Sequence, residues 1–167
     1  LYHDIETLSA IANKEVSLSY PRERLLANWK LILLNQFHDI LPGSSIMQVY
    51  EDSKEDYEKV LAEGNIMRNE AENALVSKID LKSKSIVVFN TTGFDRFDVV
   101  EADIEDESFA LFDAEGREIP YQKSYNGKII FTLSVPAKGY TTVEIRDCAP
   151  SVFSDVCADK DGADTPY

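Results

Sequence analysis

Hydrophobic residues recur at helical spacing through the first half of the chain. From Tyr2 to Ala12 the apolar positions share roughly one face, which predicts an amphipathic helix. A second helix is predicted between Pro21 and Asn35, because the first turn of a helix tolerates a proline, whose missing N–H would be unpaired there anyway. The second half of this helix is apolar nearly all round, so we expect it to be buried on several sides.

A third and longer helix is predicted after the Pro42-Gly43 break. Ser45 and Gln48 have the spacing of a capping box, which predicts that the helix begins at Ser45. Apolar positions at helical spacing continue to about Ser77. A helix of this length needs partners, so residues 1–80 are predicted to form an antiparallel helical bundle.

Three residues within this third helix have a structural interpretation. Gly64 indicates a close contact or a small kink. Tyr50 and Tyr57 lie at helical spacing, so they are predicted to pack against neighbouring helices rather than to form a platform for a ligand.

The pattern changes near residue 81 from helical spacing to short segments rich in β-branched and aromatic residues. Asn126-Gly127, between two apolar runs, is a strong hairpin signal. The predicted strands are Ser85–Asn90, Phe97–Ala102, Ser108–Asp113, Arg117–Gln122, Lys128–Ser134 and Tyr140–Arg146.

These elements predict an α+β fold divided by segment. The helical bundle at residues 1–80 is followed by an antiparallel β-sandwich-like region at residues 85–150. Residues 151–167 are predicted to be an irregular or truncated tail. Because Leu1 already lies within a helical pattern, we interpret the chain as an internal part of a longer protein.

Composition excludes some partners. The formal net charge of the 167 residues is -13, which argues against nucleic acid and against anionic membranes. No apolar run approaches the roughly 20 residues of a membrane-spanning helix. Two isolated cysteines, Cys148 and Cys157, are too few for a thiolate metal site. Two free thiols are favoured over a disulfide between them.

The most informative chemistry lies where the second helix ends, at His38-Asp39 before the Pro42-Gly43 break. A histidine at a helix C-terminus can serve a structural purpose, because the helix dipole favours a cationic imidazole there. It can also be a metal ligand, but a catalytic zinc needs about three protein ligands. The only other histidine is His3. His38 could therefore bind zinc only with ligands from elsewhere.

The segment from Asn35 to Ser45, NQFHDILPGSS, resembles a signature of glycoside hydrolase family 38, the zinc-dependent α-mannosidases. The preceding Trp29-Lys30 is also similar to the family. In the second half, Ile86–Asn90 followed by Phe94 resembles the start of the family's β domain. The LPGSS form looks more like the bacterial and cytosolic branch, which implies a cytoplasmic location.

The resemblance implies that His38 is one of the zinc ligands and that Asp39 contacts hydroxyls of a bound mannose. Zinc in this family binds sugar hydroxyls and helps to distort the ring, and hydrolysis of terminal α-mannosides is retaining. The nucleophile and the remaining zinc ligands are implied to lie in an upstream catalytic domain of the same parent chain. No catalytic residue is therefore assigned in this chain, and the isolated chain is predicted to be inactive and not to bind zinc tightly.

A rival interpretation is a non-catalytic scaffold or interaction module of helices and strands, in which His38-Asp39 belongs to a decayed site. The enzyme hypothesis expects the loop from His38 to Ser45 to be accessible and to lack local partners. The scaffold hypothesis expects His38 to be buried and fully hydrogen-bonded. Under the enzyme hypothesis the partners are a mannose-containing carbohydrate and the upstream domain. Family members often associate, so the resemblance also allows a homo-oligomer, although the sequence does not give the oligomeric state.

Overall fold

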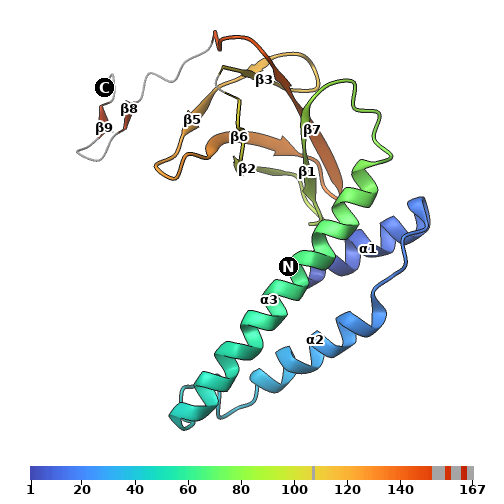
Figure 1. The fold of residues 1–167 in the computed structure, drawn as a ribbon, viewed down its shortest axis with the longest axis vertical. Coiled ribbons are helices and arrows are strands. Elements are labelled where there is room, and N and C mark those ends of the chain that lie inside the picture. The colour runs from blue at the N-terminus through green and yellow to red at the C-terminus, as the bar shows by residue number, and fades with distance from the viewer. Residues whose placement is uncertain (107, 152–156, 159–162, 165–167) are drawn as a thin grey trace. The chain divides into compact units, whose positions relative to one another are not determined.

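The structure is a computed structural model that describes residues 1–106, 108–151, 157–158 and 163–164 (Figure 1). The chain divides into two units, Leu1–Asp80 and Leu81–Tyr167. The first unit consists of helices, and the second consists of antiparallel strands. The predicted α+β fold class is confirmed.

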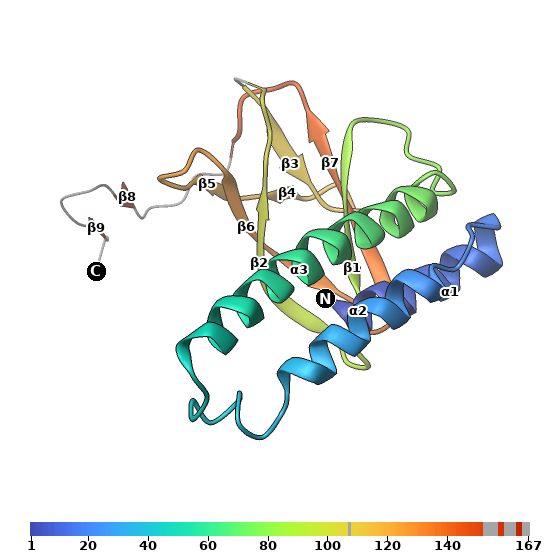
Figure 2. The same cartoon turned by 60° about the horizontal axis from the view of Figure 1, so that its bottom comes forward.

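Three helices form the first unit: α1 (Tyr2–Val16), α2 (Arg22–Asn35) and α3 (Met47–Val76). Polar contacts show that α2 and α3 run antiparallel, because residues early in α2 meet residues late in α3. The guanidinium of Arg24 donates to Glu63 and Glu70, while the side-chain amide of Asn35 reaches Asp56. Figure 2 shows α2 alongside α3, with a connecting loop at their shared end.

The core of the helical unit lies between its three helices. Ile5, Leu25 and Met67 are buried there, and the hydroxyl of Tyr2 donates to the carbonyl of Val60 at 2.9 Å. A Cβ atom at Gly64 would lie only 2.9 Å from a methyl carbon of Leu1 and 3.2 Å from the Tyr2 ring. The prediction of a close contact at this glycine is confirmed.

Two local predictions for the helices are wrong. The N-cap of α3 is Ile46, without a side-chain capping bond, because Gln48 instead donates to Asp52 one turn later. The second half of α2 is not buried on several sides, since the side chains of Leu33 and Leu34 are both 61% exposed. Among the described residues, α2 contacts α1 through Trp29 and α3 through Arg24 and Asn35, while Leu33 and Leu34 are left exposed.

The second unit contains two facing antiparallel sheets. One has the strand order β1-β7-β3-β4 and the other β2-β6-β5. The strands are β1 (Ser85–Asn90), β2 (Arg96–Ala102), β3 (Ala110–Phe112), β4 (Glu118–Ile119), β5 (Tyr121–Lys123), β6 (Ile129–Val135) and β7 (Gly139–Arg146), with a separate short pair, β8 (Cys157–Ala158) and β9 (Ala163–Asp164). Alternate residues of β6 are buried, as expected for a strand with one face toward a core. The inner faces of both sheets share that core, which includes Phe109, Leu111, Phe131 and Val143.

The strand predicted at Arg117–Gln122 is divided by Pro120. Residues before the proline pair with β3, whereas residues after it pair with β6 in the other sheet. Proline lacks the N–H that a continuous ladder requires, so the chain changes sheets at this point. The strand predicted at Ser108–Asp113 is also shorter than expected, at three residues.

The remaining predictions concern the end of the chain. Most of the predicted tail, residues 152–156, 159–162 and 165–167, lies outside the described residues. Cys148 is a free, exposed thiol, while the side chain of Cys157 lies outside the described residues. Among the described residues, no helix is both long enough and apolar enough to cross a bilayer.

Candidate functional site

His38 and Asp39 lie in the segment that joins α2 to α3, residues 36–46, at the tip of the helical hairpin (Figure 2). We call this segment the tip loop. The two side chains are 78% and 58% exposed, and Nε2 of His38 is 3.7 Å from Oδ2 of Asp39. The ring of Phe37 lies against the imidazole, with ring centroids 4.1 Å apart. An imidazole and a carboxylate are therefore presented together on an accessible loop.

Backbone hydrogen bonds fold the tip loop into consecutive tight turns. The N–H groups of Ile40 and Leu41 donate to the carbonyl of Phe37 at 2.9 and 3.1 Å, and the N–H of Gly43 donates to Ile40 at 3.1 Å. Gly43 has φ of +81°, a left-handed conformation that glycine adopts without a steric penalty. The Pro42-Gly43 pair thus specifies the shape of the loop.

A tyrosine on α3 contacts the backbone of the tip loop through its hydroxyl group. The hydroxyl of Tyr50 accepts a hydrogen bond from the N–H of Ser45 at 3.0 Å and lies 3.4 Å from the carbonyl oxygens of both Asp39 and Ile40. The hydroxyl of Ser44 also donates to the Asp39 carbonyl at 3.4 Å. The predicted accessibility of the loop is confirmed, but the prediction that it lacks local partners is wrong for its backbone.

The base of the tip loop is fixed by a buried amide. Asn35, the last residue of α2, is only 4% exposed, and its Nδ2 donates to the Leu31 carbonyl at 3.0 Å and to the Asp56 carboxylate at 3.2 Å. The bond to Asp56 ties the end of α2 to α3 just before His38, while the bond to Leu31 lies within α2. Sequence reasoning missed the roles of Asn35 and Tyr50, and their proximity in the chain to His38-Asp39 was the only available signal.

The donors in the tip loop fit part of a zinc site. Imidazole nitrogen and carboxylate oxygen are both common zinc ligands, but a catalytic zinc uses about three protein ligands and an open position. His38 and Asp39 supply at most two donors. Within the described residues, no group of three or more His, Cys, Asp or Glu side chains could hold a metal ion. Any complete zinc site at this loop needs further ligands from outside the described residues.

Large apolar side chains flank the polar pair and are exposed in this chain. We call them the apolar rim, and each is between 51% and 74% exposed: Leu33, Leu34, Phe37, Leu41, Ile46 and Met47. Scattered exposed leucines are ordinary, whereas a concentration within 15 residues of sequence indicates an interaction surface. The apolar rim is therefore suited to contact with another protein part beside His38-Asp39.

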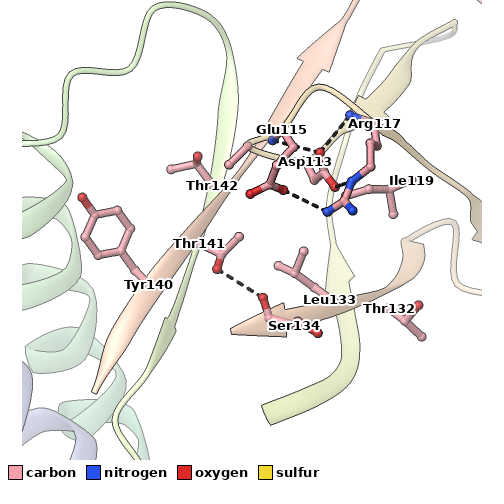
Figure 3. Close-up of a pocket in the computed structure, with 11 residues that line it drawn as sticks. Asp113, Glu115, Arg117, Ile119, Thr132, Leu133, Ser134, Tyr140, Thr141 and Thr142 are labelled. Carbon is pink, nitrogen blue, oxygen red and sulfur yellow. Dashed lines mark hydrogen bonds and ion pairs between the residues drawn. The ribbon is translucent and has the colours of Figure 1, made fainter. Parts of the chain in front are cut away.

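A second candidate is a groove of about 650 Å³ on the β unit (Figure 3). It is lined by the turn between β3 and β4, by β6 and by β7. Its charged groups are already paired with one another: the guanidinium of Arg117 donates to Asp113 at 2.7 Å and to Glu115 at 3.0 Å. The carboxylate of Asp113 also accepts the backbone N–H groups of Glu115 and Arg117.

The electrostatics of this groove are those of a structural turn. Partial desolvation opposes ionisation of Asp113, but the hydrogen bonds and the positive charge of Arg117 outweigh it and lower the pKa of the carboxyl from its ordinary value. A carboxylate stabilised in this way holds the turn in place and remains ionised to lower pH. The tip loop is thus the stronger candidate for binding chemistry.

Two other polar residues singled out by the sequence have structural positions. His3 is 67% exposed and lies on the surface of α1 beside Asp4, 3.5 Å away. Asn90, which begins a formal glycosylation sequon, is 5% exposed. Its side-chain amide donates to the carbonyls of Phe94, Val135 and Pro136, so it serves as a buried turn residue.

Comparison with known proteins finds a family model and several similar proteins, most of them named α-mannosidases. Residues 1–75 match the family described as "Alpha mannosidase middle domain". "Alpha-mannosidase 2C1" of Mus musculus is 36% identical over 101 residues, which cover 60% of this chain and 10% of that protein. "Alpha-mannosidase G" of Dictyostelium discoideum is 29% identical over 141 residues, which cover 70% of this chain and 12% of that protein. The chain thus spans about a tenth of the length of the curated relatives that it matches.

The fold also has a counterpart among solved structures. A glycosyl hydrolase family 38 protein from Enterococcus faecalis superposes with a TM-score of 0.65 at 18% identity. The match covers 93% of this chain and 24% of that one. The likeness therefore includes both the helical and the β unit.

Proposed function

We propose that this chain belongs to glycoside hydrolase family 38, the α-mannosidases, and that its tip loop forms one wall of the active site of a zinc-dependent retaining α-mannosidase. His38 is the zinc ligand of this wall, and Asp39 accepts hydrogen bonds from hydroxyls of the terminal mannose. The nucleophile, the acid/base and the remaining zinc ligands come from an upstream catalytic domain of the parent protein. The resemblance of the LPGSS segment to the bacterial and cytosolic branch of the family further implies that the parent protein is cytoplasmic.

The observation that carries this proposal is the exposure of His38 and Asp39 on a loop whose backbone is firmly held. A surface histidine with 78% exposure contributes little to folding, and its side chain has no hydrogen bond within the described residues. The side chains of the buried polar residues Asn35 and Asn90, by contrast, are hydrogen-bonded. A loop with a hydrogen-bonded backbone and an imidazole that makes no hydrogen bond is better suited to an external ligand than to helix capping.

The apolar rim supports an active site shared with another domain. Leu33, Leu41 and Met47 would lose exposed apolar surface if a second domain packed beside the tip loop, at about 25 cal/mol for each Å² removed from water. Closing that surface would also exclude water around the imidazole and carboxylate, which strengthens their electrostatic interactions. The same contact would bring the missing carboxylates close to a sugar bound at Asp39.

The chemistry assigned to this chain is binding and orientation. Zinc, when bound, supplies a Lewis acid for sugar hydroxyls. His38 would hold the ion through one ring nitrogen, and a hydrogen bond donated by the N–H of the other ring nitrogen would fix the tautomer. Asp39 would orient the mannose ring through its hydroxyl groups. A retaining reaction further requires two carboxyl groups about 5–5.5 Å apart on either side of the scissile bond, and these belong to the upstream domain.

The scaffold alternative predicts a buried, fully hydrogen-bonded His38, and the exposure of this side chain argues against that version. A scaffold with a decayed site would still leave the parent protein without α-mannosidase activity. Activity of the parent protein therefore separates the two hypotheses.

The test uses the parent protein that contains this chain. Aryl α-mannoside hydrolysis is measured with and without a chelator, and zinc content is determined, for the wild type, the His38→Ala variant and the His3→Ala variant. The His3→Ala variant is the matched control, because it removes the other exposed imidazole of the chain. We expect His38→Ala to lose zinc and activity and His3→Ala to retain both.

Two outcomes would contradict the proposal. If the His38→Ala variant keeps its zinc and its activity, His38 is not a ligand. If the wild-type parent, loaded with zinc, hydrolyses no α-mannoside, the decayed scaffold is favoured.

A further inference from the structure

The tip loop is held at its centre by a hydroxyl group from α3. We propose that Tyr50 is a positioning residue whose hydroxyl sets the direction in which His38 and Asp39 point. This inference rests on the proposed function of the tip loop. Tyr50 itself need not touch the metal or the sugar, because it acts through the backbone of the loop.

The first argument is the set of atoms that the Tyr50 hydroxyl contacts. A phenol has one proton to donate and lone pairs to accept with. Here it accepts the N–H of Ser45 at 3.0 Å, and its proton faces the carbonyls of Asp39 and Ile40, each 3.4 Å away. One side-chain atom therefore joins the middle of the loop to its end. The hydroxyl of Ser44 adds a second donor to the Asp39 carbonyl.

The second argument is that these contacts do not cap the helix. Tyr50 lies in the first turn of α3, which begins at Met47, and α3 has no side-chain capping bond at its N-terminus. The amide that Tyr50 accepts belongs to Ser45, before the helix starts. The hydroxyl is therefore used on the loop.

The third argument concerns how an exposed side chain can be oriented. His38 and Asp39 have little side-chain packing to fix them, apart from the ring of Phe37 beside the imidazole. The directions of these two side chains therefore depend mainly on the backbone conformation at residues 38 and 39. A bond to the Asp39 carbonyl fixes the peptide plane that follows this residue, so it limits rotation at the Cα that bears the carboxylate. Ligands of a metal or a substrate gain affinity when such outer contacts hold them in place.

The α3 helix provides a matched control. Tyr57 lies two turns after Tyr50 on the same helix and is 37% exposed. Its hydroxyl makes no hydrogen bond within the described part of the chain. Tyr50→Phe and Tyr57→Phe therefore remove the same atom from the same helix, but only the first change removes contacts to the tip loop.

The first experiment measures amide hydrogen exchange in this 167-residue chain without metal or substrate. In the Tyr50→Phe variant we expect the Ser45 amide to exchange about tenfold faster, because its acceptor is gone. The Tyr57→Phe variant should match the wild type. Unchanged exchange at Ser45 and through residues 38–44 in Tyr50→Phe would overturn the proposal, whatever the parent protein does.

The second experiment measures the zinc dissociation constant and the kinetics of the parent protein. Loss of an outer contact typically costs about 10–100-fold in metal affinity or activity. We expect Tyr50→Phe to weaken zinc binding within this range and to raise KM, with a thermal unfolding midpoint close to that of the wild type. A variant that unfolds earlier but binds zinc and substrate normally would show a purely structural tyrosine and contradict the proposal.

The two proposals can fail separately. If His38→Ala leaves zinc and activity intact, the proposed function fails irrespective of Tyr50. If His38→Ala abolishes both while Tyr50→Phe changes neither zinc affinity nor KM, the zinc ligand stands and the positioning role is refuted.

Discussion

Two polar loops of this chain differ in what their charged groups do. In the β3–β4 turn, the carboxylate of Asp113 accepts two backbone N–H groups and the guanidinium of Arg117. In the tip loop, hydrogen bonds from side chains hold the backbone, while the imidazole of His38 and the carboxylate of Asp39 remain exposed. The first loop uses its charges to keep its own shape. The second keeps its shape by other contacts and leaves its imidazole and its carboxylate available to a ligand.

Substituting the two aspartates should separate these roles most strongly. Asp39→Asn in the parent protein is expected to lower kcat/KM for an α-mannoside by about 100-fold, because hydrogen bonds to a charged group contribute about 1.5–3 kcal/mol each. Asp113→Asn should instead lower stability and leave kcat/KM near the wild-type value. Steady-state kinetics together with urea unfolding check both expectations. Equal kinetic losses in the two variants would remove the distinction between the loops.

The base of the tip loop should respond as a buried structural contact. Asn35→Ala removes the amide that bonds Leu31 and Asp56, and we expect it to destabilise the helical unit by about 1–3 kcal/mol. Urea unfolding followed by far-ultraviolet circular dichroism measures this cost. Gln48→Ala, which removes an exposed bond to Asp52, is the control and should change stability by less than about 0.5 kcal/mol. A neutral Asn35→Ala variant would show that the end of α2 is held by other contacts.

Two glycines with nearly equal, positive φ angles test whether loop shape matters for function. Gly43 in the tip loop and Gly116 in the β3–β4 turn have φ of +81° and +79°, and a Cβ at either position meets no atom within 4 Å. Alanine at each should therefore cost about 1–2 kcal/mol, through backbone strain alone. Thermal unfolding should show similar losses for both variants, but only Gly43→Ala should weaken zinc binding in the parent protein. Equal zinc affinity in the two variants would contradict a functional role for the loop's shape.

The smallest expected effect concerns the free energy of unfolding as a function of pH. Asp113 in the β unit and Glu72 in the helical unit should contribute to it with opposite signs. The lowered pKa of Asp113, which the bonds from Arg117 produce against partial desolvation, stabilises the β unit above the carboxyl's unfolded pKa. That contribution is lost as pH falls through the folded pKa. Burial, with a smaller contribution from Asp4, raises the pKa of Glu72 in α3 despite the opposing charge of Arg68. Ionised Glu72 thus disfavours folding at neutral pH, and its penalty disappears as pH falls below the unfolded pKa.

Urea unfolding between pH 7 and pH 3 measures whether each carboxylate stabilises or destabilises the folded chain. The stability lost in Asp113→Asn should shrink on acidification, because the wild type loses the same contribution. The stability gained in Glu72→Gln should also shrink, because the wild-type penalty disappears. A gain that persists unchanged to low pH would show that Glu72 acts through packing instead.

The sequence predicted the order and type of elements because periodicity reports which face of an element is buried. Ser85–Asn90 was predicted with its observed limits, since a β-branched run bounded by polar residues leaves little choice. The sequence contains Pro120, but it did not indicate that the chain changes sheets there. A change of sheet depends on which strands the residues before and after the proline pair with. The capping box failed for a similar reason: Ser45 and Gln48 have the required spacing, but Tyr50 and Asp52 offered better partners.

The candidate site was only partly predictable. His38-Asp39 stood out through its motif, and the structure places both residues on an exposed loop. Tyr50 was predicted to be a packing residue, because a tyrosine at helical spacing gives no indication of where its hydroxyl lies. The apolar run in α2 was expected to be buried, but periodicity reports only that the segment is apolar, and Leu33 and Leu34 are exposed among the described residues.

The central claim is that His38 is a zinc ligand, and anomalous diffraction at the zinc edge from crystals of the parent protein tests it most directly. The account predicts an anomalous peak about 2.0–2.1 Å from a ring nitrogen of His38, with the carboxylate of Asp39 facing the sugar-binding side of the ion. A zinc peak with a full set of ligands that excludes His38 would contradict it.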